Sequence, residues 1–182
     1  NLRILNGKPL MAHTIEQALE SGLSKFVVVS TDSERIAAIA KEFGAVAWFL
    51  RPSELATDDA PKLPVIRHAL KEAENYYGQL FDVLIDLDAT SPLRYVEDIL
   101  NAYNQFVNDN SDILISASPA RKNPYFNMVE LINGKVHIVK PFEKLLTRRQ
   151  DSPIVFDMNA SIYIWKRKAL LEYNTLFTNN TS

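Results

Sequence analysis

The strongest constraint on the fold is a regular alternation of short apolar runs with amphipathic helical patterns along the first two thirds of the chain. The apolar runs lie at residues 25–30, 46–50, 82–87 and 112–118, and their lengths are typical of buried strands. Between them, apolar residues recur at the spacing of helices that cover a sheet. Strands that are apolar on both faces imply a mostly parallel sheet between helix layers. The sequence therefore predicts an α/β fold.

The pattern changes in the last third of the chain. Two short apolar runs flank Asn133 and Gly134, a dipeptide that strongly indicates a β-hairpin. A polar, basic stretch follows, and residues 155–166 predict a late strand. We therefore expect a single domain over residues 1–182, with a hairpin arm at about residues 119–155.

Composition argues against several kinds of site and partner. The chain has 20 Lys and Arg against 22 Asp and Glu, so neither nucleic acid nor an anionic membrane surface is an expected partner. It has no cysteine, which excludes disulfides and thiolate chemistry. No apolar run has bilayer-spanning length and nothing resembles a signal peptide, so cytoplasm is the expected location. The widely separated His13, His68 and His137 are expected to be structural.

Asp86 and Asp88 stand at the carboxyl end of an apolar run, where open α/β sheets bind their ligands. Side chains two positions apart share one face of a strand, and a divalent cation would relieve the repulsion between these two carboxylates. Magnesium accepts one or two carboxylates together with phosphate and water oxygens. Arg51 follows the previous run and fits a phosphate or the edge of a nucleobase bound at the same edge of the sheet. The alternative is that the aspartates only stabilise the Thr-Ser-Pro turn that follows, and that Arg51 is a surface side chain.

Well-known catalytic and nucleotide-binding motifs are missing from the sequence. It contains no G-x-S-x-G elbow, no Walker loop and no G-x-G-x-x-G, so a serine hydrolase is not supported. Pattern alone therefore indicates only a nucleotide- or phosphate-binding α/β domain.

Several segments together occur in the order found in the acylneuraminate cytidylyltransferases. The chain resembles this family through NLRILNGKPLMAHTIEQAL, VVSTDSERIAAIAKEFGA, LRPSELATDDA, TSPLR, NPYFNMVE and FDMNASIYIW. The segments DLDATSPLR and NPYFNMVE look closer to the bacterial legionaminate-type branch than to the sialate branch. The resemblance implies a three-layer Rossmann-like nucleotidyltransferase domain, Mg²⁺ as cofactor, and a homodimer formed through the hairpin arm. It also implies a reaction in which CTP activates a nonulosonic acid sugar and pyrophosphate leaves.

On the nucleotide side, the resemblance assigns three positions. Asn1 matches the asparagine that closes the phosphate-gripping loop, and Arg51 matches an arginine near the cytidine. Lys62 stands where relatives place a small hydroxyl residue near the base. The glycine- and lysine-containing loop expected before Asn1, and the acidic segment expected after Ser182, are not in this sequence.

On the sugar side, the resemblance assigns residues from the late strand and the arm. Tyr163 matches a sugar-side tyrosine with Asn159 just before it, and Arg149 matches an arginine that reaches toward the partner subunit and the sugar carboxylate. Asp88 replaces the usual glutamine that touches sugar and nucleotide. We expect Asp86 and Asp88 to act in catalysis, either both holding magnesium or one doing so while the other contacts the sugar.

Two other functions stay open at this point. A sugar-1-phosphate nucleotidyltransferase shares the α/β design but carries a G-x-G-T-R type of loop. A non-catalytic nucleotide-binding or dimerisation module would have lost its phosphate loop. The residues that precede Asn1 in the natural protein would distinguish the three.

Overall fold

The computed structural model describes residues 1–142 and 147–173. The chain divides into two compact units, which we call the first unit (Asn1–Ile115 with Ser161–Ser182) and the second unit (Ser116–Ala160). Residues 143–146 of the expected arm lie outside the described residues.

The expected helices form where the apolar spacing predicts them. They are α1 (Leu10–Glu20), α2 (Glu34–Glu42), α3 (Lys62–Tyr77) and α4 (Val96–Asn108), with a short α5 (Arg167–Glu172) near the end of the described chain. Ser33 caps the start of α2, because its hydroxyl accepts a hydrogen bond of 3.3 Å from the Ile36 amide. Helix α3 ends at Gly78, whose φ of 64° suits a residue without a side chain.

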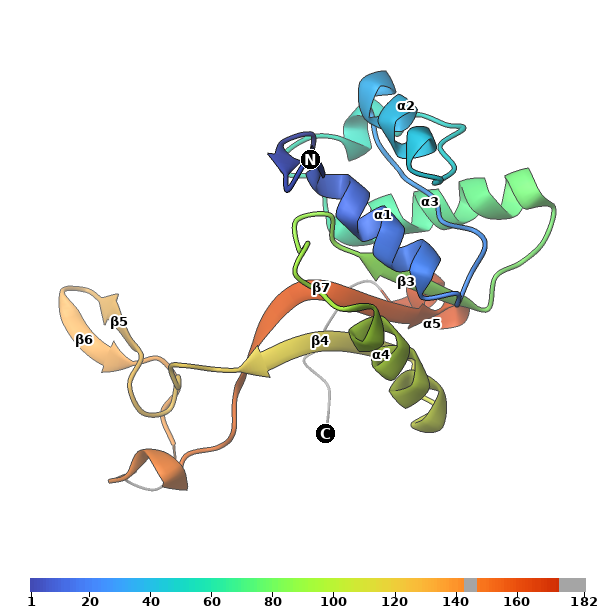
Figure 1. Cartoon of the computed structure of the whole chain (residues 1–182). Coiled ribbons are helices and arrows are strands. Elements are labelled where there is room, and N and C mark those ends of the chain that lie inside the picture. The colour runs from blue at the N-terminus through green and yellow to red at the C-terminus, as the bar shows by residue number, and fades with distance from the viewer. Residues whose placement is uncertain (143–146, 174–182) are drawn as a thin grey trace. The chain divides into compact units, whose positions relative to one another are not determined.

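The central sheet has the order β3-β7-β4, formed by Val83–Leu87, Phe156–Lys166 and Ile113–Pro119. Strand β7 runs antiparallel to β3, with Asp86 opposite Tyr163. In the first unit, α3 and α4 lie on opposite sides of β3 and β7 (Figure 1).

The expectation of a mostly parallel sheet does not hold for these strands. The late strand β7 returns antiparallel and takes the place beside β3. The runs at 25–30 and 46–50 are extended, but they are joined only by an isolated parallel bridge between Val28 and Val46. A further short antiparallel pair, β1 (Ile4–Leu5) with β2 (Lys8–Pro9), precedes α1.

Side chains of β3 alternate between two faces of the sheet, one packed against α4 and one directed toward α3. Val83, Ile85 and Leu87 pack, together with β7 residues, against Ile99 and Phe106 of α4. The β7 residues on this face are Ile162 and Ile164. Successive strand side chains point to opposite faces, so Asp86 and its neighbour Tyr163 project toward the α3 side.

A second core cluster lies under α1. Met11 and Ile15 of α1 pack with Ala40 and Ala45, and Leu2 and Ala89 contact the same cluster. Ala89 follows directly after Asp88, so this cluster anchors the loop at the carboxyl end of β3.

The second unit contains the predicted hairpin. Strands β5 (Val129–Ile132) and β6 (Lys135–Ile138) are antiparallel. Asn133 and Gly134 between them have φ angles of 50° and 77°, the positive values that a two-residue hairpin turn requires. The Asn-Gly prediction is therefore confirmed.

Many apolar side chains of the second unit are exposed in the single chain. They include Val129, Leu131, Val136, Ile154 and Phe156. By contrast, Asn123 of the NPYF segment is buried, and its amide group donates 2.9 Å hydrogen bonds to Ser152 Oγ and the Pro153 carbonyl.

In the part of the chain that the structure describes, each helix is too short or too polar to cross a membrane.

Candidate functional site

The carboxylate of Asp86 meets a cation supplied by the protein. Lys62 Nζ, at the start of α3, lies 2.7 Å from Asp86 Oδ2. The same ammonium lies 4.0 Å from the centroid of the Tyr163 ring. Tyr163 is Asp86's cross-strand neighbour, so the three side chains form one contact set on the α3 side of the sheet. A half-buried carboxylate is stabilised when a cation lies this close.

Asp88 lies just beyond the end of β3 and shapes the turn that follows. Its Oδ1 accepts hydrogen bonds of 2.7 Å from the Thr90 amide and 2.6 Å from the Thr90 hydroxyl. Through these bonds Asp88 stabilises the turn, which was the alternative to a catalytic role for this residue. The bonds occupy one carboxylate oxygen, so the turn-stabilising role leaves the other oxygen available for a ligand.

Arg94 closes the TSPLR turn and is buried, with 7% of its surface exposed. Its Nη1 donates hydrogen bonds of 2.7 Å to the Ser161 carbonyl and 2.9 Å to the Ser161 hydroxyl, and Nη2 donates one of 3.3 Å to Thr14 Oγ1. Burial lowers the pKa of the Arg94 guanidinium, while the charges of Asp88, Asp98 and Asp86 act in the opposite direction. Arg94 thus brings a positive charge close to the acidic pair.

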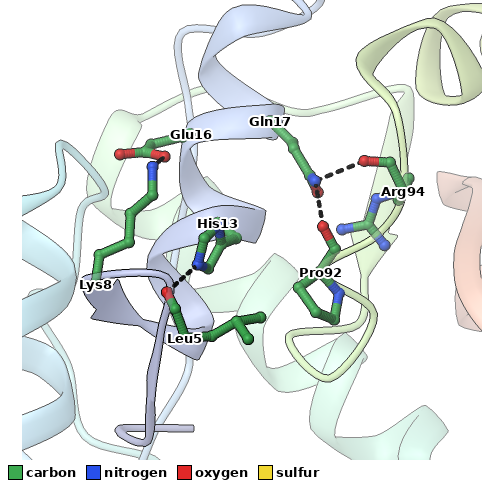
Figure 2. A network of polar contacts seen from close by, with 7 residues as sticks. All are labelled: Leu5, Lys8, His13, Glu16, Gln17, Pro92 and Arg94. Atoms are coloured by element: carbon green, nitrogen blue, oxygen red, sulfur yellow. Dashed lines mark hydrogen bonds and ion pairs between the residues drawn. The ribbon is translucent and has the colours of Figure 1, made fainter.

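Helix α1 holds the loop between Asp88 and Arg94 in place. Gln17 Nε2 donates hydrogen bonds of 2.9 Å to the Pro92 carbonyl and 2.6 Å to the Arg94 carbonyl, as Figure 2 shows. Thr14 Oγ1 donates a 3.3 Å hydrogen bond to the Asp88 carbonyl. These hydrogen bonds hold the backbone of the loop that contains Asp88 and Arg94.

The same helix also carries the β1–β2 hairpin. His13 Nε2 lies at hydrogen-bonding distance, 2.9 Å, from the Leu5 carbonyl, and Lys8 pairs with Glu16 (Figure 2). His13 therefore has the structural contact expected of it.

Of the residues expected on the nucleotide side, Arg51 lies against the end of the 25–30 run. Its Nε donates a 3.2 Å hydrogen bond to Ser30 Oγ, and Nη2 contacts the Ser30 carbonyl. Asn1 is exposed, and its carbonyl accepts a 3.1 Å hydrogen bond from the Met11 amide. The nucleotide-binding roles of Asn1, Arg51 and Lys62 stay predictions.

Of the residues expected on the sugar side, Tyr163 is buried in the first unit, with 4% of its surface exposed. Asn159 and Arg149 belong to the second unit. There Asn159 Oδ1 accepts a 2.6 Å hydrogen bond from Ser116 Oγ, and Arg149 Nη2 donates one of 3.1 Å to the Arg121 carbonyl. The structure therefore brings Asp86, Lys62 and Tyr163 together, while the sugar-binding roles stay predictions.

The sequence matches the family model described as Cytidylyltransferase over residues 1–181. The chain belongs to the cytidylyltransferase family. This confirms the family inferred from the sequence motifs, and it makes the chain a nucleotidyltransferase.

Similar proteins of known name agree with this family. The cytidylyltransferase is 49% identical over 181 residues to a CMP-N,N'-diacetyllegionaminic acid synthase of Campylobacter jejuni, covering 100% of this chain and 76% of the relative. It is 48% identical, with the same coverage, to the post-translational flagellin modification protein B of Campylobacter coli. A pseudaminic acid cytidylyltransferase of Campylobacter jejuni is 31% identical, over 97% of this chain and 75% of the relative.

A solved structure supports the fold class. CMP:2-keto-3-deoxy-manno-octonic acid synthetase complexed with CTP matches with a TM-score of 0.68 at 18% identity. The match covers 97% of this chain and 71% of that chain. At this identity the likeness shows the fold alone, and it confirms the α/β class.

Sequence reasoning missed two features of the cytidylyltransferase site. Arg94 was noted only as part of the TSPLR segment, although a charged residue that closes a turn directly after an acidic pair was an available signal. The pairing of Lys62 with Asp86 was also missed. Its signal was a lysine in the first turn of a helix, where the helix dipole disfavours a cation.

The carboxylate oxygens of Asp86 and Asp88 can be compared with the ligands that the expected magnesium ion requires. Among the described residues, no group of three or more His, Asp or Glu side chains is placed to hold a metal. Asp86 Oδ2 faces the Lys62 ammonium, whereas only one oxygen of Asp88 is occupied, by Thr90. Since magnesium often takes one carboxylate together with substrate phosphates, Asp88 fits such an ion, and Asp86 as a ligand stays an untested prediction.

Proposed function

We propose that this cytidylyltransferase transfers CMP from CTP to a nonulosonic acid of the legionaminic type. The anomeric hydroxyl oxygen of the sugar attacks the α-phosphorus of CTP, the α–β phosphoanhydride bond breaks, and pyrophosphate leaves while the hydroxyl proton is released. The observation that carries this proposal is the 49% identity, over the whole chain, to an enzyme named for making CMP-N,N'-diacetyllegionaminic acid.

The reaction requires little covalent chemistry from the protein's own side chains. Phosphoryl-type transfer is accelerated chiefly by positioning the reactants and by neutralising negative charge. A Rossmann-like, three-layer arrangement would present the carboxyl end of β3 to the triphosphate. There Lys62 and Arg51 would supply positive charge to the nucleotide, and Asn1 would contact its phosphates. Arg94 keeps the backbone of Asp88 in place through Thr14 and Ser161.

Asp88 is the residue we assign to magnesium. When bound, the ion would neutralise charge on the triphosphate oxygens. The Thr90 hydrogen bonds to Oδ1 orient the carboxylate, which leaves its other oxygen to face the ligand. Tyr163, Asn159 and Arg149 are the residues we assign to the sugar.

We further propose that the protein is a cytoplasmic homodimer formed through the arm at about residues 119–155, which lies within the second unit. Support comes from the exposed apolar side chains there, with Leu131, Val136 and Ile154 exposed by 72%, 68% and 83%. A soluble chain seldom leaves so many apolar side chains of one segment in water unless a partner covers them. Sedimentation at micromolar concentration should give the dimer mass, and a monomer would reject the proposal.

The test of function is an assay that detects pyrophosphate. The protein is incubated with CTP, magnesium and, in separate reactions, N,N'-diacetyllegionaminic acid, pseudaminic acid, N-acetylneuraminic acid and a sugar 1-phosphate. We expect pyrophosphate release with the legionaminic acid above all. Release only with the sugar 1-phosphate would favour the other class of nucleotidyltransferase, and no release with any of them would favour a non-catalytic module.

A further inference from the structure

We propose that Asp86 is a positioning residue, which holds the Lys62 ammonium where the phosphates of CTP bind and does not itself bind the metal. The inference rests on the proposed function, because it assigns a role within that same site. It makes Lys62 the substrate-contacting cation and leaves Asp88 as the metal carboxylate.

The geometry fixes the ammonium from two sides. Asp86 Oδ2 lies 2.7 Å from Lys62 Nζ, and the Tyr163 ring centroid lies 4.0 Å from it. Asp86 and Tyr163 are directly opposite each other in the β3–β7 ladder, so their separation is set by backbone pairing. A flexible lysine is thereby confined to one place at the carboxyl end of the strand.

The stability of helix α3 does not account for this lysine. Lys62 is the first residue of α3, and no side chain of the described residues caps that helix. The positive end of a helix dipole disfavours a cation there. The Lys62 side chain is 39% exposed and that of Asp86 is 24% exposed. The lysine is therefore only partly covered by the protein, and an anionic ligand can approach it.

The surroundings of Asp86 favour a partner role over a metal role. Its Oδ2 is buried and, within the described residues, accepts no well-formed hydrogen bond, so its compensation is the charge of Lys62. The nearby guanidinium of Arg94 directs its hydrogen bonds to Ser161 and Thr14. A metal bound at Asp86 Oδ2 would have to displace Lys62, and a metal bound at Oδ1 would be repelled by the ammonium that the other oxygen holds.

A double-mutant cycle tests the proposal. We would measure the dissociation constant for CTP with magnesium by calorimetry, without sugar, for Lys62→Met, Asp86→Asn and the double variant. Lys62→Met should weaken CTP binding about tenfold, because a charge-assisted contact to phosphate is lost. Asp86→Asn should weaken it by less, and the double variant should be no weaker than Lys62→Met. Lys62→Arg should retain most of the affinity, because it keeps the charge.

Lys166→Met is the matched control, because Lys166 also pairs with an aspartate (Lys166 Nζ to Asp112 Oδ1, 3.0 Å) but lies at the other end of the β3–β7 ladder. It should change CTP affinity less than about twofold, as expected for a distant exposed charge. If the loss of CTP affinity in the double variant equalled the product of the losses in Lys62→Met and Asp86→Asn, the proposal would be overturned, since Asp86 would then act independently of Lys62. Equal losses in Lys62→Met and the control, or a wild-type protein that does not bind CTP, would overturn it too. The titration needs no sugar, so for a wild-type protein that binds CTP these outcomes are independent of whether any sugar releases pyrophosphate.

Discussion

Replacing Arg94 by methionine should destabilise the first unit by about 2–4 kcal/mol. The substitution removes the 2.7 Å and 2.9 Å hydrogen bonds to Ser161, and a bond to a charged group contributes about 1.5–3 kcal/mol. It also leaves the buried hydroxyl of Thr14 without its guanidinium partner. The variant no longer has the desolvation cost of a buried guanidinium, which offsets part of the loss in unfolding free energy. The Ser161 carbonyl also keeps the 3.2 Å hydrogen bond from the Asp88 amide.

The assay is urea unfolding followed by tryptophan fluorescence, since Trp165 is fully buried in the first unit. Arg94→Met should lower the midpoint with an unchanged slope. Arg94→Lys should lie between it and the wild type, because a lysine keeps the charge but cannot bridge Ser161 and Thr14 with a planar fork. Arg35→Met, at an exposed position of α2, is the control and should stay within about 0.5 kcal/mol. If Arg94→Met behaved like this control, the structural role of the guanidinium would be refuted.

Four further substitutions probe the site and the pH dependence of stability. Asp88→Asn should lower kcat at least about a hundredfold with an unchanged circular dichroism spectrum, and an unchanged kcat would remove Asp88 from the mechanism. Arg51→Ala should weaken CTP binding about tenfold in calorimetry, and wild-type affinity would contradict its nucleotide role. Arg149→Ala should raise the sugar KM and leave CTP affinity unchanged; a loss of CTP affinity alone would count against it. Hydrogen bonds from Arg167 lower the pKa of Glu74, so the pair stabilises the protein above the ordinary carboxyl range and less as pH falls. The difference in unfolding free energy between wild type and Glu74→Gln should therefore shrink on acidification, and a difference independent of pH would contradict this.

Local signals in the sequence were sufficient for the helices and the hairpin. Helical spacing predicted α2, and Asn133 with Gly134 predicted the β5–β6 turn, because each signal depends on neighbouring residues. The sheet was different. The pairing of β7 with β3 joins segments far apart in the chain, and no local pattern encodes which strand a returning segment will join.

The same distinction applies to the site. The physical premise that Asp86 needs a cation was sound, and a metal was the candidate that local sequence offered. Lys62 was considered only as a nucleotide contact, because its position on α3 beside Asp86 of β3 depends on tertiary packing. The family resemblance could not supply the pair either, since it places a small hydroxyl residue at that position.

The register of β7 against β3 links the core to this site. Ile162 and Ile164 face α4, whereas Tyr163 and Trp165 are buried on the other face, so a slip of one residue would bring the two larger rings against α4 in place of the isoleucines. The same register places Tyr163 opposite Asp86 and brings the Ser161 carbonyl to the Asp88 amide. Burial of the isoleucines therefore selects the one alignment in which the Lys62 ammonium can contact both Asp86 and Tyr163. Hydrophobic packing on one face of the sheet thus sets the electrostatics on the other.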